Sequence, residues 1–263
     1  MNRRKLYEAL CQSYPKELSC SWDNDGAMLC LDWDKEVKKA LVCLDVTDEA
    51  VRAACDEHCD LIVSHHPFIF RGVKSIDGDG LFGKRVKALC EKNIAVFSFH
   101  TRADCARGGL NDRFAAAIGL ENVTDVLDPE EGLPLGRIGT LEDCSAEEAA
   151  LIAASALGHP VKLFKGSDTA KRLMCVCGGG KEFLPLAQKE GCDTFLSGDL
   201  SYNLVLDCTQ SGLNVIEVSH YSSEILCLDM FCEAINAADS DITVIKSSFG
   251  ACGEVVFPEI LGI

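Results

Sequence analysis

The sequence predicts an α/β protein that is built from two related lobes. Short apolar runs rich in Val, Ile and Leu alternate with segments of helical periodicity, which is typical of strands covered by helices. The run and helix within 41–64 have a counterpart later in the chain, in 174–197. A repeat of so long a period favours two similar lobes over a solenoid.

The first half of the chain begins with a predicted amphipathic helix. Its start is basic, but Glu8, Gln12 and Lys16 interrupt the apolar residues that a signal peptide would need. Apolar runs then predict strands over 40–46, 61–64 and 94–99. Asn111 and Gly119 are suitable start and stop residues for a short helix. The helices expected here cover residues 2–13, 48–58, 82–92 and 112–118.

The second half repeats this alternation after a turn-rich junction at residues 128–134. We therefore expect a first lobe over 1–127 and a second over 128–263, with residues 225–263 able to pack back on the first lobe. The expected strands are 172–177, 194–197, 215–218, 242–245 and 254–257. The expected helices are 146–157, 181–190 and 222–236.

The composition narrows the class of protein. A formal charge of −16 over 263 residues argues against binding to nucleic acid or to an anionic membrane, since both require Lys and Arg. Sixteen cysteines are scattered, several within apolar runs, and no C-x-x-C pair occurs. So many thiols indicate a reducing, cytoplasmic location. No apolar stretch approaches the roughly 20 residues of a membrane span.

The strongest chemical signal is the pair His65 and His66, which follows the apolar run 61–63 and precedes Pro67. Neighbouring side chains on a strand point to opposite faces, so two histidines can converge only where the strand ends. Imidazole is the commonest nitrogen ligand of first-row metals. The pair therefore indicates two metal ions side by side, although a histidine can also be a hydrogen-bonded core residue.

Two further clusters contain residue types that bind metals. His100 stands at the end of a predicted strand and Asp104 follows four residues later; His100 could be a ligand, a partner of a ligand or a proton shuttle, and Asp104 could instead belong to a turn. His220 and Glu224 have the same spacing, which places them on one face of a helix. As an isolated motif, this second cluster could equally be a surface pair.

Two glycine- or turn-rich segments are weaker candidates. Residues 22–26 form a turn-like stretch before the first strand, in which Asp23 and Asn24 are weak candidate ligands and a structural turn is the alternative. Gly178, Gly179 and Gly180 separate a strand from a helix, an arrangement that can bind phosphate at the helix N-terminus but is more often a tight turn. No G-x-S-x-G motif is present, which argues against a serine hydrolase.

Taken together, these motifs resemble the NGG-interacting-factor-three-like family, whose bacterial members are often labelled GTP cyclohydrolase I type 2 homologues. After Asp199 the chain departs from many relatives, which carry a basic or histidine-containing stretch where residues 200–203 stand here. The matching segments are 22–26, 60–67, 100–104, 108–112, 178–180, 193–199 and 218–224.

The resemblance implies a two-lobed α/β protein without an inserted middle domain, with a di-metal site between the lobes. It also implies a ring-shaped homohexamer. It implies as ligands His65, His66, Asp104, His220 and Glu224. Mixed imidazole and carboxylate ligation suits two divalent ions per chain, drawn from zinc, iron, manganese and nickel. The expected function is that of a metal-dependent hydrolase of a nucleotide or related small molecule, with His100 as a candidate proton carrier. The alternative is a metal-dependent binding or scaffold protein without turnover.

Overall fold

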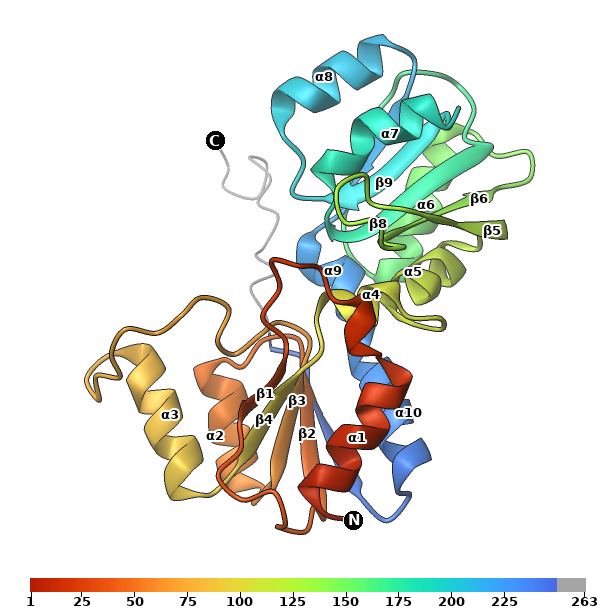
Figure 1. The fold of residues 1–263 in the computed structure, drawn as a ribbon. Coiled ribbons are helices and arrows are strands. Elements are labelled where there is room, and N and C mark those ends of the chain that lie inside the picture. The colour runs from red at the N-terminus through yellow and green to blue at the C-terminus, as the bar shows by residue number, and fades with distance from the viewer. Residues whose placement is uncertain (250–263) are drawn as a thin grey trace, which may run out of the picture. The chain divides into compact units, whose positions relative to one another are not determined.

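The structure is a computed structural model that describes residues 1–249 (Figure 1). It contains two sheets with helices against them and divides into two compact units. The first comprises Met1–Arg113, Asp125–Leu135 and Ile225–Phe249, and the second comprises Phe114–Thr124 and Gly136–Glu224. Among the described residues, no helix has the length and apolar character that crossing a membrane demands.

The first unit is built on a five-stranded sheet in the order β1-β4-β3-β2-β11. Helices α2 and α3 cover one face of this sheet, and α1 and α10 cover the other (Figure 1). A short 3₁₀ turn at Lys16–Leu18 follows α1. The elements are α1 (Arg3–Ser13), β1 (Gly26–Leu29), β2 (Lys39–Cys43), α2 (Asp48–Asp56), β3 (Leu61–Ser64), α3 (Leu81–Glu91), β4 (Ala95–Ser98), α4 (Thr101–Cys105), α10 (Cys227–Ala238) and β11 (Thr243–Ser247).

The central strands β2, β3 and β4 run parallel and are buried on both faces, which explains their continuous apolar sequences. Cys43 and Cys59 lie in the core beside this sheet and behave as small apolar residues. Burial raises the pKa of Cys59 to about 11, so its thiol stays protonated at neutral pH. These parallel strands bring the ends of β3 and β4 to one edge of the sheet.

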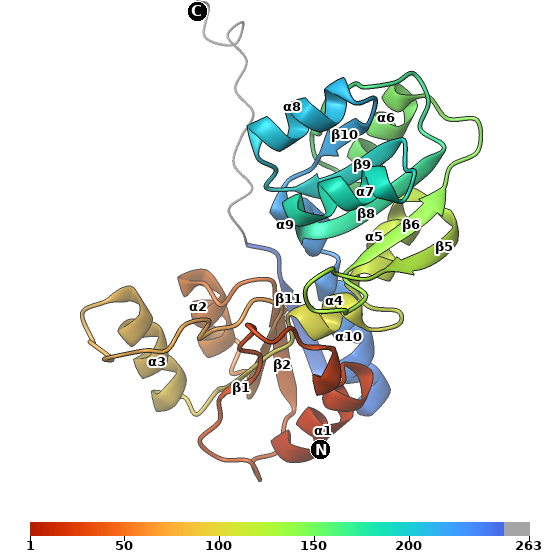
Figure 2. The same cartoon turned by 45° about the horizontal axis from the view of Figure 1, so that its top comes forward.

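The second unit is built on a six-stranded sheet in the order β5-β6-β8-β9-β10-β7. Helices α7 and α8 lie on one face of it and α6 on the other (Figure 2). Helix α5 (Leu110–Ile118) contains the boundary between the units. The other elements are β5 (Glu121–Val126), β6 (Gly136–Thr140), α6 (Ala146–Leu157), β7 (Lys162–Phe164), β8 (Arg172–Gly179), a 3₁₀ turn (Lys181–Phe183), α7 (Leu184–Lys189), β9 (Thr194–Gly198), α8 (Tyr202–Gln210), β10 (Asn214–Glu217) and α9 (His220–Glu224).

The two units repeat one topology. The strand order β1-β4-β3-β2 of the first unit recurs as β7-β10-β9-β8 in the second. In both, the first of these strands is antiparallel to its neighbour and the remaining pairs are parallel. A helix precedes each set, and a five-residue helix, α4 or α9, follows it. The predicted α/β fold with two related lobes is therefore confirmed.

A matching pair of aspartates supports the repeat at the level of hydrogen bonds. The carboxylate of Asp60 accepts hydrogen bonds from the backbone N–H groups of Lys38 and Lys39. Asp193, its counterpart in the second copy of the repeat, accepts hydrogen bonds from the backbone N–H groups of Lys171 and Arg172. Each aspartate thus binds the start of the neighbouring parallel strand, in the place that the repeat predicts.

Several elements differ from the sequence prediction. Strands β1, β5, β6 and β7 and helices α4 and α8 were not expected, because they are short or lack a clear apolar period. The predicted helix 222–236 is two helices, α9 and α10, and the segment 181–190 begins as a 3₁₀ turn. The predicted strand 254–257 lies outside the described residues. The domain bounds 1–127 and 128–263 stay a prediction; of the C-terminal segment, residues 225–249 belong to the first unit, where β11 pairs with β2.

Candidate metal centre

Three histidines gather at the ends of two parallel strands in the first unit. His65 and His66 directly follow β3, and His100 lies just after β4. Their ring centroids are 5.2 to 5.6 Å apart, and one ligand nitrogen from each lies within 4.8 Å of the others. The predicted convergence at the strand end is therefore present, and this group is able to hold a metal ion.

Hydrogen bonds fix the orientation of the adjacent pair. His65 is fully buried, and its Nδ1 lies 3.1 Å from the backbone carbonyl oxygen of Phe99. A carbonyl only accepts, so Nδ1 carries a proton, and in the neutral form of the ring the lone pair is then on Nε2. His66 Nδ1 lies 2.8 Å from a carboxylate oxygen of Asp45. A carboxylate behind an imidazole is the usual arrangement at metal-binding histidines, because it fixes the tautomer and the ring.

His100 is held by a buried carboxylate in the same way. Its Nδ1 lies 2.9 Å from Asp23, whose second oxygen accepts hydrogen bonds from the backbone N–H and the hydroxyl of Thr101. Burial by itself would raise the pKa of Asp23, but the hydrogen bonds from His100 and Thr101 outweigh it and lower the pKa to about 2. For His100, burial lowers the pKa, but hydrogen bonding to Asp23 and the charge of Asp104 more than compensate and raise it.

Asp104 joins the group from the short helix α4. It is buried, and its Oδ1 lies 3.5 Å from His65 Nε2. His100 caps the N-terminus of the same helix. Because α4 follows β4 immediately, the sequence His100-x-x-x-Asp104 places a carboxylate opposite the histidine that follows β3. The first unit therefore combines three imidazoles with one carboxylate.

The second unit holds a smaller set on helix α9, which occupies the position equivalent to α4. His220 Nε2 lies 2.9 Å from Glu224 Oε2, so the predicted i, i+4 pair is on one helix face. His220 Nδ1 lies 2.7 Å from Asp199 Oδ2. Glu224 is only 4% exposed, although its charged form is costly to bury. The same motif, a histidine held by a carboxylate beside a second acid, thus occurs in both units.

The glycine turn after β8 makes room for Glu224. Gly178 has φ of +65°, and a Cβ there would overlap Glu224 Oε1 and lie 3.3 Å from His220 Nε2. The backbone N–H of Gly178 also donates to Ser223 Oγ at 2.9 Å. A Cβ on Gly180 would meet the hydroxyl of Ser197. These glycines therefore allow close packing around α9, and phosphate binding by this turn stays a prediction.

The sequence did not identify the aspartates that hold the histidines. Nothing in the local sequence marks Asp45 or Asp199 for this role, and Asp23, a weak candidate ligand by sequence, contacts His100 in the structure. One signal in the sequence points to Asp199 as a residue of the site. When the two copies of the repeat are aligned, Asp199 stands at the position of His66. Ligation by the predicted residues is a proposal that the arrangement of each unit supports.

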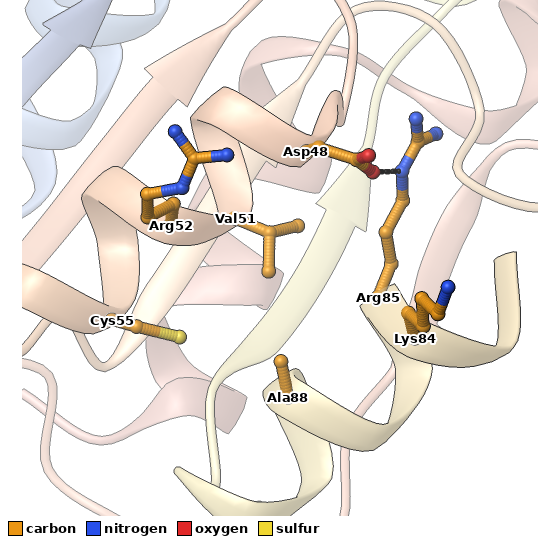
Figure 3. A pocket seen from close by; sticks show the side chains of 7 residues that line it. All are labelled: Asp48, Val51, Arg52, Cys55, Lys84, Arg85 and Ala88. Atoms are coloured by element: carbon orange, nitrogen blue, oxygen red, sulfur yellow. Dashed lines mark hydrogen bonds and ion pairs between the residues drawn. The ribbon is translucent and has the colours of Figure 1, made fainter. Parts of the chain in front are cut away.

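A separate hollow of about 360 Å³ lies between α2 and α3 (Figure 3). Its floor is apolar, and its single carboxylate, Asp48, is hydrogen-bonded to Arg85. A lining with one neutralised carboxylate and no histidine does not suit a metal ion, so the histidine group is the better candidate site. The lining residues are Asp48, Val51, Arg52, Cys55, Lys84, Arg85 and Ala88.

Comparison with known proteins gives consistent matches over nearly the whole chain. A family model described as Duf34/NIF3 (NGG1p interacting factor 3) matches residues 1–251. A Clostridium perfringens protein named GTP cyclohydrolase 1 type 2 homolog is 31% identical over 239 residues, covering 89% of this chain and 91% of the relative. Reduced HcgD from Methanocaldococcus jannaschii has a TM-score of 0.84 at 28% identity, over 95% and 98% of the two chains. A Bacillus cereus protein related to NIF3 has a TM-score of 0.85 at 19% identity, over 98% and 99%, and shares the fold.

Proposed function

Because the chain belongs to the Duf34/NIF3 family, we propose that it is a dinuclear metal protein that hydrolyses a nucleotide or a related small molecule. The observation that carries this proposal is the group of three histidines at the ends of β3 and β4. Each ring is held at Nδ1 by an oxygen atom. In this proposal Nε2 is the coordinating atom of His65 and His66, and in His100 it is the atom that would carry a proton. A histidine that is only a hydrogen-bonded core residue would not need to lie beside two other histidines.

The proposed ligand set combines residues of both units and two divalent ions, which could be zinc, iron, manganese or nickel. Imidazole nitrogens with carboxylate oxygens are a donor set that all four of these ions accept. Bound ions would lower the pKa of water toward neutrality and hold the substrate for attack. The proposed ligands are His65, His66, Asp104, His220 and Glu224.

The neighbouring residues have separate roles in this proposal. Asp45 and Asp199 hold His66 and His220 in the orientation that directs Nε2 away from the carboxylate. His100 is a candidate to take up or deliver a proton at Nε2, because Asp23 holds its opposite nitrogen and favours the charged ring. A mutation of Asp23 would therefore affect proton transfer more than the binding of metal.

The substrate class rests on the names of the relatives. The C. perfringens protein is named as a GTP cyclohydrolase 1 type 2 homolog, which makes GTP the first compound to test. The net charge of −16 disfavours a free tetra-anionic nucleotide unless metal ions offset the repulsion. Phosphoesters and cyclic amides are the next compounds to test, since both are hydrolysed by dinuclear centres.

A hydrolysis screen on metal-reconstituted protein tests the proposal. We expect turnover of at least one of these substrates, its loss after chelation, and its loss in the double variant His65→Ala/His66→Ala. Two bound metals without turnover on any compound would instead favour a metal-dependent binding or scaffold protein. Turnover that survives both chelation and the double substitution would contradict the assignment of the site.

We further propose a cytoplasmic homohexamer. The hexamer follows from the family resemblance, and the cytoplasmic location is supported by sixteen cysteines without a C-x-x-C pair. Light scattering should then give six times the 28.4 kDa mass of one chain. A monomer at micromolar concentration would contradict the assembly but leave the metal site untouched.

A further inference from the structure

Two large aromatic side chains are exposed next to His100. Trp22 is 56% exposed and Phe70 is 46% exposed. The two ring centroids are 6.2 Å apart, and the centroids of Trp22 and Phe70 lie 6.0 Å and 6.2 Å from that of His100. The contacts are edge-on, with interplanar angles between 74° and 86°. We call Trp22 and Phe70 the aromatic pair.

The segment that carries Trp22 is fixed on both sides. The next residue, Asp23, is bound to His100 and Thr101, and the backbone N–H of Cys20 donates to the Thr101 hydroxyl. Ser21 donates to Glu131 from both its backbone and its hydroxyl. The indole therefore projects from a constrained turn and not from a loose loop.

Phe70 is held in a comparable way. The side-chain amide of Asn24 donates to the carbonyl of Ile69, which ties the turn bearing Trp22 to the segment bearing Phe70. Two residues earlier, Phe68 packs on Phe82 of α3, and its backbone N–H donates to Ser98. Both rings are thus positioned by contacts that would persist without them.

Keeping two such rings half exposed costs free energy, because each could bury a large apolar area. Sites that bind small molecules are lined mainly by apolar and aromatic side chains, together with a few convergent polar groups. From this geometry we propose that the aromatic pair binds a planar heteroaromatic ring of the substrate by stacking, next to the histidine group. The inference rests on the proposed function, because it names the substrate class of the same site.

Stacking on an aromatic side chain tolerates many bases, because every base has a π face, and removing one such side chain typically weakens binding about tenfold. The aromatic pair therefore favours any ligand with a flat ring, and discrimination between different rings depends on polar groups. Trp22 contributes the larger face and should matter more than Phe70.

The test compares guanosine 5′-monophosphate with ribose 5-phosphate, which has the same sugar phosphate but no ring. Both are titrated calorimetrically against the metal-loaded chain of 263 residues. We expect the nucleotide to bind at least about tenfold more tightly, and Trp22→Ala to remove most of that difference while leaving ribose 5-phosphate unchanged. Trp22→Phe should keep part of the difference. Tyr202→Ala, which removes an aromatic residue 75% exposed on α8, should change neither titration.

Three results would overturn the inference. The first is that the wild type binds the two compounds with equal affinity. The second is that Trp22→Ala weakens the binding of both compounds by the same factor. The third is that Trp22→Ala changes the mass of the assembly but not the binding, which would make the aromatic pair a contact between chains. The metal content of every variant separates this inference from the proposed function. A protein that binds two metals but does not prefer the nucleotide over ribose 5-phosphate would refute the stacking alone. A protein that prefers the nucleotide but takes up no metal would refute the metal centre alone.

Discussion

Substituting Gly178 by alanine tests how closely the turn after β8 is matched to Glu224. At this glycine φ is +65°, and the added Cβ would overlap Glu224 Oε1. Glu224 would have to turn away and lose its position 2.9 Å from His220 Nε2. Gly158→Ala is a matched control in the same unit, because Gly158 also has φ of +65° but a Cβ there would meet nothing within 4 Å.

The magnitudes follow from two separate effects. A left-handed backbone costs alanine about 1–2 kcal/mol relative to glycine, and both variants should show this loss. The overlap adds about 1–3 kcal/mol in Gly178→Ala alone, by analogy with overpacked cores. Because Glu224 is a proposed ligand, moving its carboxylate should also weaken metal binding by about tenfold or more.

Urea unfolding and a competitive titration with a chelator measure these two effects. We expect Gly178→Ala to be less stable than Gly158→Ala and to bind metal more weakly than either Gly158→Ala or the wild type. Equal stability of the two variants would show that the overlap is relieved without cost. Metal affinity at the wild-type level in Gly178→Ala would refute the assignment of Glu224 as a ligand.

Three further predictions concern the histidines and the aspartates. His65→Ala/His66→Ala should lose bound metal but still unfold cooperatively, as elemental analysis and circular dichroism would show; two retained metals would contradict the site. Asp199→Ala should lower metal affinity about 10- to 100-fold in a chelator titration, and an unchanged affinity would deny it a role. Asp60→Ala and Asp193→Ala should each destabilise the fold by about 1–3 kcal/mol in urea, since each carboxylate accepts two backbone hydrogen bonds. Burial would raise the pKa of Asp60, but backbone hydrogen bonds from Lys38 and Lys39 and the ammonium of Lys35 lower it below its usual value. The stabilising contribution of Asp60 is therefore fully present at neutral pH, and the deficit of Asp60→Ala should disappear as the pH falls through the lowered pKa.

The parallel strands and the residues at their ends could be predicted because both leave strong local signals. A run such as 61–64 is apolar on both faces, and the observed β3 has the same bounds. The convergence of His65 and His66 could be predicted from their place at the end of that strand, because only there can neighbouring side chains converge. The repeat of 41–64 in 174–197 also predicted the related topology of the two units.

Strands β5 and β6 left no comparable signal. In β5, four of the six residues are exposed, so its sequence has no apolar period. In β6, Arg137 is fully buried, and Gly139 lies where a Cβ would meet Leu120, so the strand contains residues that usually argue against a sheet interior. The position of β6 also depends on β8, where Cys175 lies opposite Arg137, and this pairing leaves no local signal in the sequence.

The partners of the histidines could not be found from spacing, because tertiary structure brings them together. Asp45 and His66 are separated by 21 residues, as are Asp199 and His220. Asp23 and His100 are separated by 77. A single aspartate near a strand end is common, and only the fold shows which of them faces an imidazole.

Elemental analysis of protein purified without added metal or chelator tests whether the chain holds a dinuclear metal centre. We expect about two equivalents of a divalent transition metal per chain, and a loss of both in His65→Ala/His66→Ala. Absence of bound metal in the wild type, even after reconstitution with zinc, iron, manganese and nickel, would contradict this expectation.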